Sequence, residues 1–186
     1  LTGKNPIRVK TSNRIIELHI SDKNLVSVDM GIPELDPSKI PFEASRAATL
    51  YTIDVDGQSQ QIAAVSMGNP HAVLQVDDVA TAAVAELGAK IESHPRFPNR
   101  VNVGFMQILS RNEMKLRVYE RGVGETEACG SGACAAAVAA IQQGLVNASV
   151  TLQLTRGSLK IDWQGEGHAL IMTGPATTVF HGRIKI

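Results

Sequence analysis

Two cysteines lie close together in a segment rich in glycine and alanine, and one of them is placed where a thiol could react. Residues 127–136 read Glu-Ala-Cys-Gly-Ser-Gly-Ala-Cys-Ala-Ala. We predict that a helix begins at Gly130-Ser131, leaving backbone N–H groups unpaired at the positive end of the helix dipole. Such donors can hold a carboxylate or a developing oxyanion, and the same position favours a thiolate. Cys129 is therefore predicted to be a catalytic thiol with a lowered pKa.

The alternative for Cys129 is a buried, inert cysteine beside a tight glycine turn, which is a common environment for this residue. Cys134 lies five residues further on, inside the alanine run. For Cys134 the interpretation as a small core residue is favoured.

Asn69 and His71 flank Pro70 in a turn at the end of an expected strand. Both side chains could donate hydrogen bonds to a substrate, and histidine could tune a nearby thiol. The alternative is a turn with a hydrogen-bonded asparagine. Asn102 stands between two valines and needs a polar partner, which could be a substrate in a pocket or a structural hydrogen bond.

Glu120 and Arg121 end another expected strand, just before a glycine-rich turn that leads to Cys129. Together they could bind the ammonium and the carboxylate of an amino acid, since arginine suits a two-pronged grip on a carboxylate. The alternative is a solvated turn with a surface ion pair.

Most of the chain reads as short strands with β-branched, alternating patterns. The expected strands cover residues 7–10, 14–20, 25–30, 50–55, 61–67, 72–76, 101–109, 114–119, 149–154, 158–163, 169–173 and 179–186. A hairpin turn is expected at 22–24, and the proline-punctuated segment 31–42 is a candidate crossing between domains. One helix is predicted from Asp77, which would cap it, to Gly88, which would end it.

The second predicted helix runs from Gly130 to Gly144, and its small apolar residues imply burial on all sides. We therefore predict an α+β fold, with a mainly antiparallel sheet wrapped as a barrel around a central buried helix.

The composition narrows the class of protein. The chain has 186 residues, 44% of them hydrophobic, with 18 basic and 18 acidic side chains and no basic cluster. We expect neither a nucleic-acid partner nor a membrane surface or span. Two clustered cysteines suit a reducing cytoplasm. The sequence lacks metal-ligand spacings and nucleotide-binding motifs, so the expected chemistry needs no metal and no cofactor.

Taken together, these motifs resemble those of the diaminopimelate epimerase family. Residues 68–71, 100–105, 119–122 and 128–136 occur in the family's order and spacing, and the closing Thr173-Gly-Pro-Ala also fits. The resemblance covers essentially the whole chain.

The resemblance implies a cofactor-independent epimerase that interconverts LL- and meso-2,6-diaminopimelate, for lysine and peptidoglycan precursor biosynthesis. Two cysteines on opposite faces of the α-carbon would remove and deliver the proton, and Cys129 would be one of them. Gly130 and Ser131 would hold the reacting carboxylate, while His71 and Glu120 would adjust thiol pKa values. The expected substrate-binding residues also include Asn69, Asn102, Glu120 and Arg121.

The chain departs from the family pattern because it has no Cys-Gly-Asn-Gly-type motif, which carries the other cysteine. We expect residues 1–29 to be the tail of an otherwise missing first domain, 30–174 the second domain, and 175–186 a strand returning to the first. This chain would then be inactive alone, and the complete protein a homodimer. The alternatives are a non-catalytic domain of this fold, or an isomerase of the proline racemase or phenazine-biosynthesis type.

Overall fold

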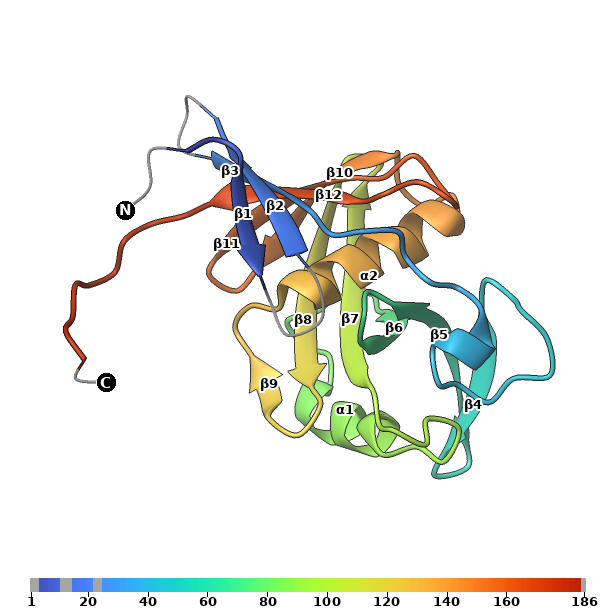
Figure 1. Ribbon diagram of the computed structural model, residues 1–186. Helices are drawn as coiled ribbons and strands as arrows, with labels where there is room; N and C mark the ends of the chain where they lie inside the picture. Colours follow the sequence, from blue (N-terminus) through green and yellow to red (C-terminus); the bar gives the residue numbers. More distant parts are fainter. Residues whose placement is uncertain (1–3, 11–14, 22–24, 185–186) are drawn as a thin grey trace.

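Helix α2 (Gly130–Gln142) runs through the middle of the protein, and the rest of the chain is built around it (Figure 1). The structure is a computed structural model that describes residues 4–10, 15–21 and 25–184. Every residue from Gly132 to Ala140 is buried, as the sequence predicted. The helix closes with Gly144 in a left-handed conformation (φ 69°), where its N–H donates to the Ile141 carbonyl. Small side chains on every face let strands approach α2 from several directions.

The described residues form one continuous, strongly curved sheet. Its strands are β1 (Ile7–Lys10), β2 (Ile15–Ile20), β3 (Leu25–Asp29), β4 (Tyr51–Val55), β5 (Gln58–Ser66), β6 (Pro70–Gln75), β7 (Asn102–Ser110), β8 (Glu113–Glu120), β9 (Gly124–Thr126), β10 (Ser149–Leu154), β11 (Gly157–Asp162) and β12 (Ile171–Pro175). The order is β1-β2-β3-β12-β11-β10-β8-β7-β6-β5-β4, with β9 paired to β8. Pairing is antiparallel except for β6–β7 and β8–β10.

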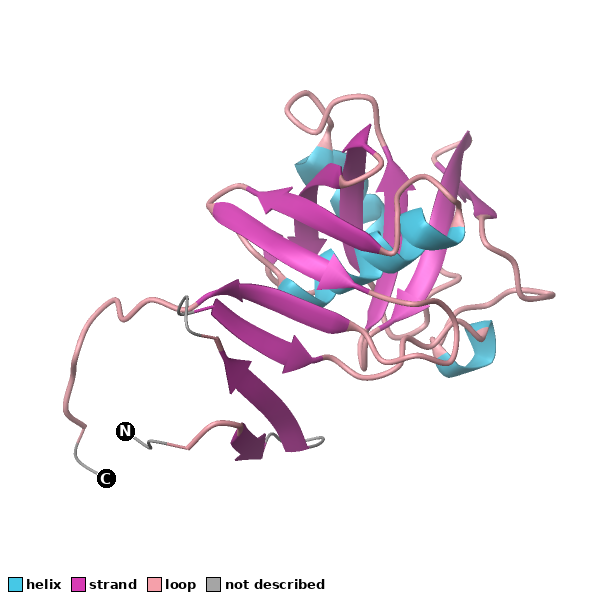
Figure 2. Ribbon diagram, turned by 90° about the horizontal axis from the view of Figure 1, so that it is seen from above, coloured by secondary structure: helices cyan, strands magenta, loops and turns pink. Residues whose placement is uncertain are grey.

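The predicted barrel is not confirmed, because the sheet formed by the described residues is not closed: β1 and β4 are its two end strands. The sheet curves around α2, which packs against β5–β8 and against β10 and β11. The strands next to the N-terminus project away from the body that contains α2 (Figure 2). The α+β class, with a mainly antiparallel sheet wrapped around a buried helix, is confirmed.

The half of the sheet that contains β5 and β6 is covered on both faces. Along β5, Ala63 and Val65 face the core around α2, whereas Ile62 and Ala64 face a second core. This alternation follows from the two-residue period of a strand. The second core contains Phe42, which stacks on Phe97 with 4.6 Å between ring centroids, and residues of α1 (Val84–Glu92). Strands β7 and β8, which both helices contact, lie between α2 and α1.

The prediction of a helix at 77–88 is wrong in its position, because α1 begins at Val84 and ends at Glu92. The carboxylate of Asp78 accepts the Ala80 N–H at 2.9 Å, which makes a local turn instead of a helix start. Gly88 does not end the helix. It lies where α1 crosses β8, and a Cβ atom there would be 2.7 Å from the Cβ of Tyr119.

Other expectations met mixed outcomes. Strand β9 was not predicted, and the described residues 176–184 contain no strand, contrary to the one expected at 179–186. The segment 31–42 is irregular as expected, apart from a short 3₁₀ turn at Pro37–Lys39. The hairpin turn expected at 22–24 lies outside the described residues. Within the part that the structure describes, neither α-helix has the length and apolar character needed to cross a membrane.

The close approach of α1 to β8 makes a stability prediction. Gly88→Ala should destabilise the protein by about 1–3 kcal/mol, because the new methyl group would overlap the root of the Tyr119 side chain. The intrinsic helix preference of alanine offsets only about 1 kcal/mol of this cost. Urea unfolding measures the difference. The control is Gly157→Ala, where the added Cβ meets nothing within 4 Å. A Gly88→Ala protein as stable as its parent would contradict the predicted contact.

Candidate active site

Cys129 is the residue that immediately precedes α2, and its backbone is extended (φ −141°, ψ 108°). Its carbonyl accepts the Ala133 N–H at 2.9 Å, while its side chain makes no capping bond to the helix. The thiol is therefore left for other partners, and it is 7% exposed. Gly132 leaves room for it, since a Cβ there would lie 3.3 Å from the sulfur. The predicted helix start is confirmed, and it places the thiol against the first turn of α2.

The predicted lowering of the Cys129 pKa is wrong, because burial raises the pKa of this thiol above its ordinary value. The Ser131 hydroxyl and the Gly132 backbone N–H act in the opposite direction, and the nearby Glu120 carboxylate raises the pKa further. Donors at a helix start do favour the thiolate, as the sequence indicated. Loss of hydration destabilises the thiolate more than these hydrogen-bond donors stabilise it, so the resting form is the thiol.

A line of side-chain hydrogen bonds leads from Cys129 back to β6. The Ser131 hydroxyl lies 3.6 Å from the Cys129 sulfur and 3.3 Å from Nδ2 of Asn69. His71 Nε2 lies 3.1 Å from Oδ1 of Asn69. An amide oxygen only accepts, so this contact assigns the proton to Nε2 of His71. Asn69 in turn donates to the Ser131 hydroxyl, which keeps both a proton and a lone pair for the sulfur, so either Cys129 or Ser131 can donate in the contact between them.

His71 anchors this line as a neutral group. It is 1% exposed, and burial, with the positive charge of Arg121, lowers its pKa to about 3. The described contacts link His71 to Cys129 through Asn69 and Ser131. A neutral ring so placed fixes the orientation of the Asn69 amide instead of supplying a charge. Its predicted role in adjusting the thiol would thus be exerted through two intervening side chains.

Asn102 ties two turns together. Its Nδ2 donates to the Pro70 carbonyl and its Oδ1 accepts the Arg121 N–H, both at 3.0 Å. The residue is 4% exposed and begins β7, where it pairs with His71 on β6. Of the two alternatives that the sequence left open, the structural hydrogen bond is observed. Asn102 thereby holds the turn at 68–71 against the turn that follows β8.

Glu120 and Arg121 point to different partners instead of forming an ion pair with each other. The Glu120 carboxylate accepts the Thr126 hydroxyl at 2.5 Å, and its effect on the Cys129 pKa places it beside the thiol. Arg121 Nη1 donates to the Asn99 carbonyl at 2.8 Å. The structure thus brings Cys129, Glu120 and Ser131 together. Arg121 lies at the edge of this group, held by the hydrogen bond from its backbone N–H to Asn102.

The core interpretation of Cys134 is confirmed, because its side chain is fully buried. Sequence reasoning missed two residues that shape the site. Thr126 lies on β9, which was not predicted, and Glu92 is a buried carboxylate at the end of α1. Glu92 did not stand out because a carboxylate among apolar helix residues gives no local signal of its partner. Thr126 did not stand out because its strand was not predicted.

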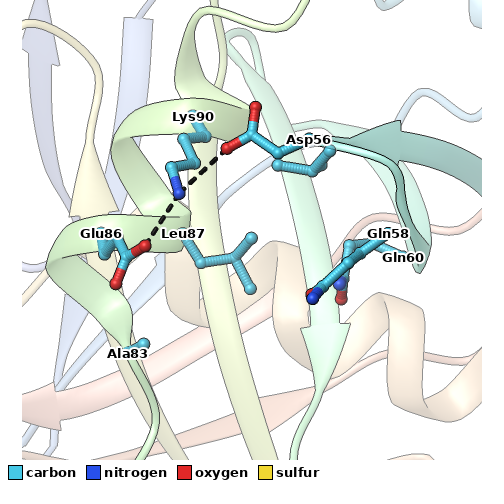
Figure 3. Close-up of a pocket in the computed structure, with 8 residues that line it drawn as sticks. Asp56, Gln58, Gln60, Ala83, Glu86, Leu87 and Lys90 are labelled. Carbon is cyan, nitrogen blue, oxygen red and sulfur yellow. Dashed lines mark hydrogen bonds and ion pairs between the residues drawn. The ribbon is translucent and has the colours of Figure 1, made fainter.

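A cavity of about 290 Å³ lies between α1 and the β4–β5 turn, away from the predicted residues (Figure 3). Lys90 crosses it and pairs with both Asp56, at 3.0 Å, and Glu86, at 2.8 Å. The charged side chains that line the cavity therefore pair with one another. Across the described ranges, no three histidine, cysteine or acidic side chains converge as metal ligands would.

Solved structures with a similar fold are racemases, epimerases and related isomerases. A probable proline racemase from Agrobacterium radiobacter K84 matches with a TM-score of 0.71 and 15% identity, over 100% of this chain and 63% of that one. A hydroxyproline epimerase from Agrobacterium vitis matches with a TM-score of 0.62 and 16% identity, over 92% and 57%. At these identities the likeness shows the fold alone, which this chain shares with proline racemase and phenazine-biosynthesis proteins.

Closer relatives define the family within that fold. The sequence profile of the family described as diaminopimelate epimerase matches residues 63–179. The diaminopimelate epimerase of Pseudomonas syringae pv. syringae is 58% identical over all 186 residues, which span 67% of that relative. That of Pseudomonas entomophila is also 58% identical, with the same coverage. The chain belongs to the diaminopimelate epimerase family, and it matches the C-terminal part of these relatives.

The state of His71 can be tested by NMR of its ring nitrogens. We expect Nε2 to carry the proton and no titration between pH 5 and 8, because burial lowers the pKa of His71 to about 3. Unfolded histidine binds a proton below about pH 6.5, so the free energy of unfolding should fall as the pH drops below that value, by up to about 1.4 kcal/mol per unit. His71→Gln should lose this part of the pH dependence. A ring that titrates near pH 6.5 would contradict the buried, neutral assignment.

The environment of Cys129 can be tested by its rate of alkylation with iodoacetamide at fixed pH in a Cys134→Ala background. Glu120→Gln should speed the reaction, because removing a nearby negative charge lowers the thiol pKa. Ser131→Ala should slow it, because the thiolate loses a hydrogen-bond donor. Glu86→Gln on α1 removes a carboxylate remote from the thiol and serves as the control. Equal rates in all these proteins would show that the contacts do not act on the thiol.

Proposed function

We propose that this chain supplies one of two catalytic thiols to an epimerase that interconverts LL- and meso-2,6-diaminopimelate without a cofactor. The supporting observation is Cys129 at the start of a helix buried from Gly132 to Ala140, with the Ser131 hydroxyl in contact with its sulfur and linked to Asn69 and His71. Membership of the diaminopimelate epimerase family supplies the substrate. The reaction belongs to lysine biosynthesis and feeds peptidoglycan precursors.

The proposed reaction removes the α-proton of an amino acid and returns a proton to the opposite face of the carbon. A thiolate takes the proton while a thiol on the other side gives one up, so the substrate changes configuration and the two sulfurs exchange roles. The raised pKa of Cys129 suits it to wait as the donating thiol. The backbone N–H groups of Gly130 and Ser131 would hold the reacting carboxylate, whose charge grows as the proton leaves.

Asn69, Asn102 and Arg121 are proposed to bind the distal end of the substrate, and Glu120 to bind its ammonium group. Glu120 would accept the ammonium group, and its charge already acts on Cys129. Arg121 sits at the rim with its backbone fixed by Asn102. The role of Asn102 would then be exerted largely through the two turns that it joins.

The second thiol must come from outside these 186 residues. Cys134 is the only other cysteine in the sequence, and it lies inside α2 with its sulfur 3.9 Å from that of Met172. It cannot reach the opposite face of a substrate held at the start of the same helix. We propose that the N-terminal third of the relatives, which this chain does not match, carries the opposing base, and that this chain alone is inactive.

Strands β1, β2, β3 and β12 form one end of the sheet, and this end offers a surface for the proposed N-terminal domain. Its register aligns Leu18, Val28 and Met172 on one face, and Ile7, Val9, Ile16, Ile20 and Val26 continue the same face. Met172 packs beside Gly130, so this apolar face leads directly from the start of α2. Val9 is 41% exposed and Ile20 is 40% exposed, which leaves apolar area for a partner. We propose that residues 1–29 and 175–186 belong with that first domain, and 30–174 form the second.

We further propose that the complete protein is a cytoplasmic homodimer. Neither Cys129 nor Cys134 forms a disulfide, which suits a reducing compartment. A proline racemase or phenazine-type isomerase shares the fold but not the 58% identity that the family relatives show. Proline is therefore the substrate against which specificity should be checked.

Incubation of the full-length gene product with LL-diaminopimelate in D₂O should place deuterium at the α-carbon. Cys129→Ser should lower kcat by about 10²- to 10⁴-fold, because a serine hydroxyl is a far weaker acid than a thiol. Cys134→Ala is the matched control, which removes the core thiol and should retain turnover. Unchanged turnover in Cys129→Ser, or racemisation of proline in preference to diaminopimelate, would overturn the assignment. Turnover by the 186 residues alone would refute the proposal of a missing second thiol.

A further inference from the structure

Glu92, the last residue of α1, is a buried acidic side chain outside every motif that points to the active site. The residue is 7% exposed and lies on a helix otherwise packed against β7, β8 and β9. Buried carboxylates are costly unless their oxygens are hydrogen-bonded. The hydrogen-bond partners of Glu92 therefore indicate which part of the structure this buried carboxylate holds in place.

The strongest contact of Glu92 is with the turn that connects β8 to β9. Its Oε1 accepts the backbone N–H of Gly122 at 2.7 Å and also lies 3.4 Å from Nη1 of Arg100. Arg100 is largely exposed, so its pairing contributes little. The short bond to a backbone N–H is the interaction that fixes position, because it constrains the main chain itself.

The turn held in this way contains Arg121 and directly follows Glu120, two of the residues that are proposed to bind the substrate. Glu120 and Arg121 immediately precede Gly122, and Asn102 and the Asn99 carbonyl hold Arg121 from the same side. Gly122 has a left-handed conformation (φ 75°), so a tight reversal occurs at the residue that Glu92 grips. The bond from Glu92 therefore acts on the turn just after Arg121.

The close packing of α1 on β8 brings Glu92 within reach. Gly88 lies one turn earlier on α1 and lets the helix approach the side chain of Tyr119, where a Cβ atom would be 2.7 Å away. Tyr119 directly precedes Glu120. Close packing thus fixes α1 to β8 just before Glu120 and Arg121, and the carboxylate of Glu92 fixes α1 to the turn just after them.

We infer that Glu92 is a positioning residue of the epimerase, which holds Glu120 and Arg121 in the geometry that binds the substrate. This inference rests on the proposed function. Loss of the acceptor oxygen leaves the Gly122 N–H without its partner and frees the turn. Substrate binding must then order the turn again, so the expected effect is on KM more than on kcat.

The test compares Glu92→Met with Glu92→Gln in the full-length enzyme. Methionine keeps the length of the side chain but has no strong acceptor, whereas glutamine keeps an oxygen for Gly122. Glu92→Met should raise KM for diaminopimelate about tenfold, equivalent to about 1.4 kcal/mol, with kcat changed much less. Glu92→Gln should restore KM to within about twofold of the parent. Hydrogen exchange of residues 120–124 should be faster in Glu92→Met only.

Ile91→Val is the matched control, because Ile91 is a fully buried neighbour on α1 whose apolar side chain can make no hydrogen bond to the turn. It should lower the melting temperature and leave KM and the exchange of 120–124 unchanged. If Glu92→Met does not fold, Glu92→Ala replaces it in the same comparison with glutamine. A lowered melting temperature with unchanged KM, or a glutamine variant as impaired as methionine, would overturn the inference. An inactive parent enzyme would instead refute the proposed function, so the two failures are distinguishable.

Discussion

Burial of α2 on all sides is the constraint on which the rest of the protein depends. From Gly132 to Ala140 the helix consists of alanine with one glycine, one cysteine and one valine and has almost no polar surface, so strands must cover it in several directions. That requirement curls an open sheet around the helix and carries β8 and β6 past its first turn. The turns at 68–71 and 120–123 follow from those strands and meet where α2 begins. The site is thus a consequence of how the sheet must bend.

The same burial sets the chemistry of Cys129. Its position before α2 offers donors that favour a thiolate, but the strands that cover the helix also exclude water from the sulfur. The two effects oppose each other, and desolvation is the larger. Asn69 and His71 hold the Ser131 hydroxyl beside the sulfur, where it can accept from the thiol or donate to the thiolate. Burial thus favours the thiol, while Ser131 remains a hydrogen-bond donor for the anionic form, as the proposed proton transfer requires.

Much of the fold could be predicted because its signals are local. The bounds of α2, most strands and the core position of Cys134 follow from alanine content, two-residue alternation and glycine stops. The start of α1 could not, because Asp78 can serve equally as a helix cap or in a local turn. Gly88 marked a helix end by its type, whereas contact with Tyr119 explains why glycine is needed inside the helix.

The sequence by itself determined the candidate site residues Asn69, His71, Asn102, Glu120 and Cys129, because they stand in short motifs of neighbouring residues. Only the tertiary structure decided what each of them contacts. The direction of the Cys129 pKa depends on how much water the covering strands remove, and the partners of Asn102 are backbone groups 19 and 32 residues away. Whether the sheet closes also depends on packing at its far ends. Desolvation and long-range hydrogen bonds have no signature in neighbouring residues, so they appear only when the chain is folded.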